Sequence, residues 1–191
     1  MTPRPVLHHV NLKTTRLQAM IDWYGTVLGM QVIFQNDVAA WLSNDDANHR
    51  LALLAFPGFE DDPDKARHTG IHHTAHEFAS FGDLMATYAR LRAAGITPGA
   101  CLDHGMTTSL YYSDPDGNRV ELQVDNIGDW AASKLHMQTS PDFAANPIGV
   151  FFDPDAMLAA HESGTGFDEI HTRATAGEYV PTQTPDLGLP G

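Results

Sequence analysis

The stretch Leu7–Lys13, which reads LHHVNLK, decides the fold of this chain. Polar and apolar residues alternate along it, so His9 and Asn11 share one face of a predicted strand and Val10 and Leu12 share the other. We therefore expect a half-buried strand whose polar face opens with a histidine.

A helix and three further strands are predicted after this first strand. The apolar residues of Leu17–Leu28 recur at helical spacing, and Gly29 supplies the stop that commonly ends a helix. The next strands are predicted at Gln31–Gln35, Val38–Leu42 and Arg50–Phe56, separated by turn-rich pieces.

The same order of elements is predicted a second time. The stretch Ile71–Phe78 (IHHTAHEF) resembles a strand, and Phe81–Ala94 has a helical apolar stripe with Gly95 after it. Three strands are then predicted at Ile96–Asp103, Thr108–Ser113 and Arg119–Val124.

The two predicted series of elements align at a constant offset in residue number. His9 and His73 lie 64 residues apart, as do Tyr24 and Tyr88, and each of these histidines is the second of a His-His pair. An internal repeat explains this agreement, because neither half could bury the apolar face of its sheet alone. The chain is therefore predicted to be α+β. Two repeated βαβββ modules (residues 5–57 and 68–127) would form one curved mixed sheet around a metal site in a domain spanning 1–127. A partly irregular C-terminal extension would follow at 128–191.

Composition excludes several classes of partner and location. The net charge of −13 repels phosphate backbones and anionic lipid, so neither nucleic acid nor a membrane is expected as a partner. No apolar run approaches about 18 residues, no apolar signal region opens the chain, and the single Cys101 cannot form an internal disulfide. We expect a cytoplasmic protein.

Three residues of metal-ligating type fall at matching positions of the predicted sheet. His9 and His73 open the first strand of each module, and Glu121 lies on the last strand, on the face opposite Val120 and Leu122. Two imidazoles and one carboxylate on one face form the facial triad that suits Fe(II) with open positions, with zinc as a second choice.

At these residues the sequence resembles the vicinal oxygen chelate superfamily, which includes glyoxalases and bleomycin-resistance proteins. The resemblance covers roughly residues 6–125. The spacing His104-(x6)-Tyr111-(x2)-Asp114-Pro-x-Gly-(x3)-Glu121 is more specific. It is similar to the signature of one-domain type I extradiol ring-cleavage dioxygenases of the 2,3-dihydroxybiphenyl and catechol type. Leu102 departs from the residues that this signature usually has at its position.

The resemblance implies a function and a role for each site residue. It implies a dioxygenase that opens a catechol-type aromatic diol with O2 at a non-haem iron, Fe(II), in aromatic compound degradation, with Mn(II) as an open alternative. His9, His73 and Glu121 would be the metal ligands. Three residues would be catalytic. His49 would be the acid–base group, Tyr111 would contact the substrate hydroxyls, and His104 would be a histidine one layer further from the substrate.

Two other functions stay open on the same scaffold. A glyoxalase-type metal-dependent isomerase or lyase would usually add a fourth protein ligand from the strand after His49, where Leu51–Phe56 offers only apolar candidates. A metal-free binding protein of the bleomycin-resistance kind would lack the triad.

The extension carries scattered apolar residues that would be costly to leave in water. We expect these residues to cover the mouth of the pocket or a neighbouring subunit, which predicts a homo-oligomer. The hydrophobic candidates for the pocket lining favour a larger aromatic substrate; they are Phe56, Met106, Ile148 and Phe151.

Overall fold

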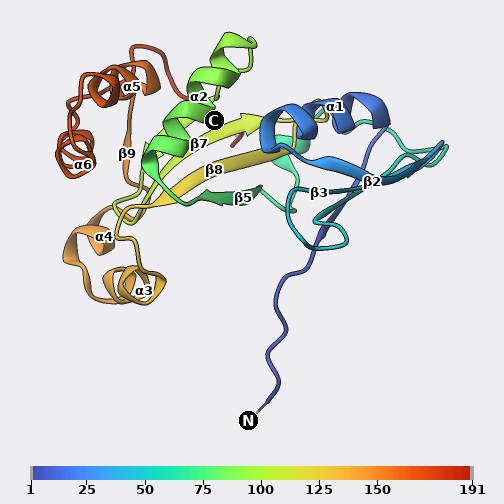
Figure 1. Cartoon of the computed structure of the whole chain (residues 1–191), viewed down its shortest axis with the longest axis horizontal. Coiled ribbons are helices and arrows are strands. Elements are labelled where there is room, and N and C mark those ends of the chain that lie inside the picture. Colours follow the sequence, from blue (N-terminus) through green and yellow to red (C-terminus); the bar gives the residue numbers. More distant parts are fainter. Residues whose placement is uncertain (1, 190–191) are drawn as a thin grey trace. The chain divides into compact units, whose positions relative to one another are not determined.

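The computed structural model describes residues 2–189 of the chain (Figure 1). It consists of two compact units, each of which is described by itself. Unit 1 holds the residues up to 68 together with 114–118, and unit 2 holds residues 69–113 together with those from 119 onward. The predicted domain boundary at residue 127 stays a prediction.

Unit 1 contains the first βαβββ module. Its four-stranded sheet has the order β1-β4-β3-β2, in which β1 runs parallel to β4 and the other neighbours are antiparallel. The module consists of β1 (Val10–Lys13), α1 (Leu17–Leu28), β2 (Gln31–Asn36), β3 (Ala39–Ser43) and β4 (Leu51–Leu54).

Unit 2 repeats this arrangement. The strand order β5-β8-β7-β6 again pairs the first and last strands of the module in parallel. The module consists of β5 (His73–Phe78), α2 (Phe81–Ala93), β6 (Ala100–Asp103), β7 (Thr107–Ser113) and β8 (Arg119–Asp125). The predicted α+β class and the repeated element order are confirmed.

Local sequence explains where the two module helices begin and end. Gly29 follows α1 with φ of 64°, a left-handed conformation that glycine adopts at little cost, and its amide hydrogen-bonds to the Tyr24 carbonyl. Ser80 precedes α2, and its side chain accepts a hydrogen bond from the Asp83 amide. A short 3₁₀ helix at Lys65–Arg67, which was not predicted, lies between the modules.

One buried hydrogen-bonded cluster organises the turn before β8. The carboxylate of Asp114 is 4% exposed and accepts hydrogen bonds from the Tyr24 hydroxyl and from the amide and side chain of Asn118. Burial raises the pKa of Asp114 despite these contacts. The turn carries the positive-φ Gly117 in the sequence Asp-Pro-Asp-Gly.

The extension is more regular than predicted. It was predicted to be partly irregular, but helices make up much of it. The extension contains α3 (Trp130–Thr139), α4 (Pro141–Ala145), β9 (Val150–Phe151), α5 (Pro154–Glu162) and α6 (Phe167–Thr175).

The sheet of unit 2 is not formed by the repeated module alone, as predicted, but includes a strand of the extension. β9 pairs with β6 and adds a fifth strand to the sheet of unit 2. Phe152, Ile170 and Tyr179 are buried within the same unit, so these apolar residues do not need a neighbouring subunit to cover them. The predicted homo-oligomer stays a prediction, without that part of its support.

No helix among residues 2–189 has the length and apolar character needed to cross a bilayer. Helix α6 contacts the sheet of unit 2 through His171. Its Nδ1 lies 2.7 Å from the carboxylate of Asp103, which is fully buried on β6. This ion pair holds helix α6 of the extension against strand β6 of the sheet.

We predict that His171→Ala lowers the free energy of unfolding by about 1–3 kcal/mol, because it removes a partner of a buried carboxylate. The hydrogen bond to Asp103 outweighs burial and raises the pKa of His171 above 6.5. The ion pair therefore contributes fully below pH 6.5, and its contribution declines as the pH rises through the raised value.

Urea denaturation should thus give a larger difference between wild type and variant at about pH 6 than at about pH 9. Thr172→Ala, at an exposed position on the same helix, should change stability by less than about 0.5 kcal/mol. An equal loss for His171→Ala at both pH values would contradict the charged pair.

Candidate active site

The candidate site of unit 2 is built around the carboxylate of Glu121 on β8. Glu121 lies directly opposite Tyr111 on β7 and Ala75 on β5. The small Ala75 leaves room for His73 to reach diagonally, and His73 Nε2 lies 3.0 Å from Glu121 Oε2. The glutamate side chain is only 6% exposed, whereas the histidine is 33% exposed.

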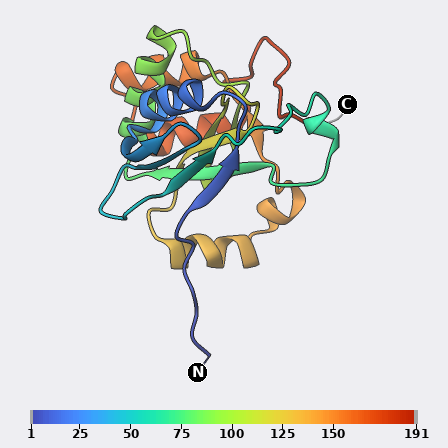
Figure 2. The same cartoon turned by 90° about the vertical axis from the view of Figure 1, so that its right-hand side faces the viewer.

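The strand alternation places these groups on one face of the sheet. Val120, Leu122 and Val124 are buried on the other face, the side covered by α2 in Figures 1 and 2. The predicted orientation of Glu121, opposite its apolar neighbours, is thus present in unit 2.

A hydrogen-bonded chain continues from Glu121 to the extension. The Tyr111 hydroxyl lies 2.9 Å from both Glu121 Oε1 and His104 Nε2. On the other side of its ring, His104 Nδ1 lies 2.6 Å from the carbonyl oxygen of Ile148. The family resemblance implied that Tyr111 and His104 belong together, and the structure brings them into contact.

The carbonyl of Ile148 determines which nitrogen of His104 carries the proton. A carbonyl oxygen can only accept, so Nδ1 must donate. In a neutral imidazole Nε2 then carries the lone pair, so the Tyr111 hydroxyl has two acceptors at 2.9 Å, His104 Nε2 and Glu121 Oε1, for its single proton. Whichever of the two accepts that proton, the phenol oxygen keeps a lone pair for a donor such as a substrate hydroxyl.

Burial and neighbouring charge shift the ionisation of this group of residues. Burial raises the pKa of Tyr111, and the nearby Glu121 carboxylate raises it further, so the phenol stays protonated. Burial also opposes ionisation of Glu121, but its contacts with His73, Ser109 and Tyr111 outweigh burial and lower its pKa. The site thus holds a carboxylate beside a protonated phenol.

A cavity of about 580 Å³ opens beside these residues in unit 2. His73, Glu121, Tyr111 and His104 all line it, as does Met106 in the turn between β6 and β7. This volume lies within the range of about 300–1,000 Å³ that is typical of small-molecule sites.

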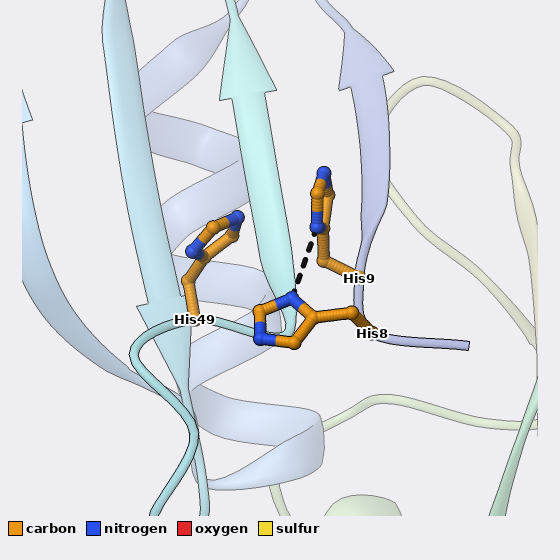
Figure 3. Close-up of side chains that lie close together, drawn as sticks. All are labelled: His8, His9 and His49. Carbon is orange, nitrogen blue, oxygen red and sulfur yellow. Dashed lines mark hydrogen bonds between the residues drawn. The ribbon is translucent and has the colours of Figure 1, made fainter. Parts of the chain in front are cut away.

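Unit 1 gathers three histidines at the start of its sheet (Figure 3). His9 directly precedes β1, and His49 lies in the loop that leads into β4, the strand beside β1. Their ring centroids lie 4.4 Å apart, and His8, which we had read as structural or outward-facing, packs against both rings. Burial, together with His9 and His8, lowers the pKa of His49, which favours its neutral form at pH 7.

The predicted site residues thus fall into two groups. His73, Glu121, Tyr111 and His104 form one hydrogen-bonded chain in unit 2, and His9 and His49 lie together in unit 1. Whether His9 shares a metal ion with His73 and Glu121 stays a prediction.

The donor set in unit 2 fits a divalent metal ion. Two ligands at right angles on one ion, each at about 2.1 Å, lie about 3 Å apart, which is the separation of His73 Nε2 and Glu121 Oε2. A buried carboxylate also requires compensating charge, which a divalent ion would supply. An imidazole and a carboxylate are ligands that Fe(II), Mn(II) and zinc all accept.

Sequence reasoning identified the lining of the cavity only in part. Met106 lines it, but Ile148 is exposed and Phe151 packs against the core residues of β6. Phe56 belongs to unit 1. The lining residues of α3 were missed, because their helical pattern gave no sign of which face would meet a cavity.

We predict that Gly149→Ala disturbs His104. Gly149 has φ of 91°, and an added Cβ would lie 2.0 Å from the Asp103 carbonyl oxygen and 2.7 Å from His104 Cα. The backbone must therefore move. We expect a loss of about 1–2 kcal/mol for the left-handed conformation and about 1–3 kcal/mol more for the overlap.

Gly164→Ala is the matched control, since Gly164 has φ of 89° and nothing within 4 Å of an added Cβ. Urea denaturation should separate the two variants. Nitrogen-15 NMR of the imidazole should show a changed tautomer balance at His104 only in Gly149→Ala. Equal stability and unchanged His104 signals would reject this role for the loop.

Comparisons with known proteins agree with this geometry. Residues 6–122 match the model of the Glyoxalase/Bleomycin resistance protein/Dioxygenase superfamily. The chain is 43% identical over 190 residues to biphenyl-2,3-diol 1,2-dioxygenase 2 of Rhodococcus globerulus, covering 100% of this chain and 97% of that protein. It is 41% identical to biphenyl-2,3-diol 1,2-dioxygenase 3 of the same organism, covering 92% of each.

The fold has solved counterparts as well. A glyoxalase/dioxygenase from Nostoc punctiforme superimposes with a TM-score of 0.53 at 21% identity, covering 63% of this chain and 90% of that one. The match of the family model over both modules and the full-length relatives lead to one conclusion: the chain belongs to the Glyoxalase/Bleomycin resistance protein/Dioxygenase superfamily.

Proposed function

We propose that this protein is an extradiol dioxygenase that opens the aromatic ring of a catechol-type diol with O2. The observation that carries the proposal is the chain His73–Glu121–Tyr111–His104 on one wall of the unit 2 cavity. Full-length relatives named biphenyl-2,3-diol 1,2-dioxygenases support it and suggest a diol of that kind.

We propose Fe(II) as the metal, with Mn(II) as the alternative, held by His73, Glu121 and His9. The geometry of the first two supports a shared ion, and His9 is proposed because it is the repeat equivalent of His73. When bound, the ion supplies adjacent open positions for diol and O2 and conducts electron density between them.

Tyr111 and His104 would orient the substrate. His104 donates to the Ile148 carbonyl, and the Tyr111 hydroxyl donates its proton to Glu121 or to His104, so the phenol oxygen can accept a hydrogen bond from one hydroxyl of the diol. The burial of Tyr111, which is 5% exposed, keeps this contact away from competing water.

His49 is proposed as the acid–base group. A neutral imidazole can take the proton of a diol hydroxyl when the substrate binds and return it to the departing oxygen during ring opening. The lowered pKa of His49 supports a neutral base at pH 7. The strand that follows, Leu51–Leu54, is entirely apolar, which fits a three-ligand set better than the four-ligand set of a glyoxalase-type enzyme.

The direct test is oxygen uptake by protein that has been reconstituted anaerobically with Fe(II) and then mixed with a panel of catechols. We expect one O2 consumed per diol, together with a coloured ring-opened product. A chain that retains Fe(II) but consumes no O2 with any diol would refute the proposal. Failure to retain any metal would favour a binding protein instead.

The metal ligands are tested by His73→Ala and Glu121→Ala. Each variant should fold but lose most of its bound iron, measured by elemental analysis after reconstitution, because two protein ligands hold the ion poorly. His76→Ala is the matched control, since this histidine lies on the same strand and pairs with Leu122 on the opposite face. Full iron content in either ligand variant would overturn the assignment.

For His49→Ala we expect normal iron content and diol binding, with kcat reduced by about 10²–10⁴-fold, the usual effect of losing an acid–base group. His8→Ala is the neighbouring control and should retain most of its activity. Unchanged turnover in His49→Ala would leave this residue without a catalytic role.

A further inference from the structure

Helix α3, the first element of the extension, forms one wall of the unit 2 cavity. Trp130, Ser133, Lys134 and Met137 all line it, one helical turn after another. In Figures 1 and 2, α3 lies on the opposite side of the sheet from α2, which is the side on which Glu121 and Tyr111 lie. The helix therefore faces the proposed reaction site.

Polar contacts hold α3 against the strands. The buried Ser133 donates a hydrogen bond to the carboxylate of Asp125 at the end of β8, and Trp130 Nε1 donates to Glu77 Oε1 on β5 at 3.0 Å. Asp129 caps the first turn by accepting from the amides of Ala131 and Ala132. Contacts at both strands give the wall a defined position.

Two of the four side chains that this wall offers are apolar and exposed. Trp130 is 73% exposed and Met137 is 47% exposed, although both line the cavity. Together with Met106 they provide an indole and two thioethers, groups that pack well against an aromatic ring. A ligand that fills the cavity would remove this apolar surface from water.

The size of the cavity indicates that the ligand is larger than one ring. Its volume of about 580 Å³ is in the range that holds drug-sized molecules, so a single catechol ring beside Glu121 and Tyr111 would leave the α3 side empty. Trp130 contacts Glu77, which pairs with Gln123, two residues beyond Glu121 on β8, so the space beside α3 lies further along the strands than Glu121.

We propose that α3 is the specificity wall of the enzyme and that Met137 and Trp130 bind an aryl substituent on the diol. The inference rests on the proposed function for the position of the diol ring. It adds that the extension, outside the repeated modules, selects aryl-substituted diols over simple catechols.

The test compares Met137→Ala with Leu135→Ala in the full-length, iron-loaded protein. Leu135 lies on the same helix, is 58% exposed and does not line the cavity. Anaerobic calorimetry measures the binding of biphenyl-2,3-diol and of catechol. For Met137→Ala we expect about tenfold weaker binding of the biphenyl diol, or 1.4 kcal/mol, with catechol affected less than about twofold.

Leu135→Ala should leave both affinities unchanged, and Met137→Leu should restore most of the lost affinity, because it replaces the apolar volume. The ratio of kcat/KM for the two diols should follow the binding data. Equal changes in affinity for both diols, or no change for either, would overturn the proposal that α3 determines specificity.

The charged residue Lys134 makes an anionic substituent the competing possibility, because it lines the same wall. Tighter binding of a carboxylate-bearing catechol than of the biphenyl diol would assign the wall to an anionic substituent and overturn the proposal.

Calorimetry measures binding and does not require the enzyme to turn over its substrate. Selective loss of biphenyl diol binding without ring cleavage would therefore support the wall and contradict only the proposed reaction.

Discussion

A carboxylate buried on the face of a β-sheet must be compensated, and Glu121 is that carboxylate in unit 2. Its side chain is 6% exposed on β8, with Tyr111 directly across on β7 and His73 diagonal on β5. Its contacts with both of these residues and with Ser109 lower its pKa against the effect of burial. The chemistry of the site follows from this one residue, because each partner of Glu121 thereby faces the same cavity.

The extension is bound into this arrangement by polar contacts to the strands. The Ile148 carbonyl sets the tautomer of His104, His171 pairs with the buried Asp103, and Ser133 bonds to Asp125. In each pair a group of the extension meets a group at or beside the end of β6 or β8. The extension thus contacts unit 2 at the ends of β6 and β8, close to the site. Its strand β9 also adds a fifth strand beside β6.

The repeated module also explains why two histidines open equivalent strands. In each module the first strand lies parallel to the last, so a residue at the start of the first strand sits beside the start of the last. His73 is therefore near β8 and its Glu121, and His9 is near the loop that carries His49. One topology yields a carboxylate partner in one module and an imidazole partner in the other.

The sequence by itself determined the helix and strand order of the two modules and the face of the sheet on which Glu121 lies. Helix α1 begins and ends at the predicted residues, and period-two alternation placed Glu121 opposite Val120 and Leu122, because backbone geometry alone dictates both. Only the tertiary structure decided which distant segments complete the site. The bond from His104 to Ile148, the pairing of His171 with Asp103 and the cavity face of α3 join residues about 15 to 70 positions apart. Such contacts depend on how the extension packs, which no local periodicity encodes.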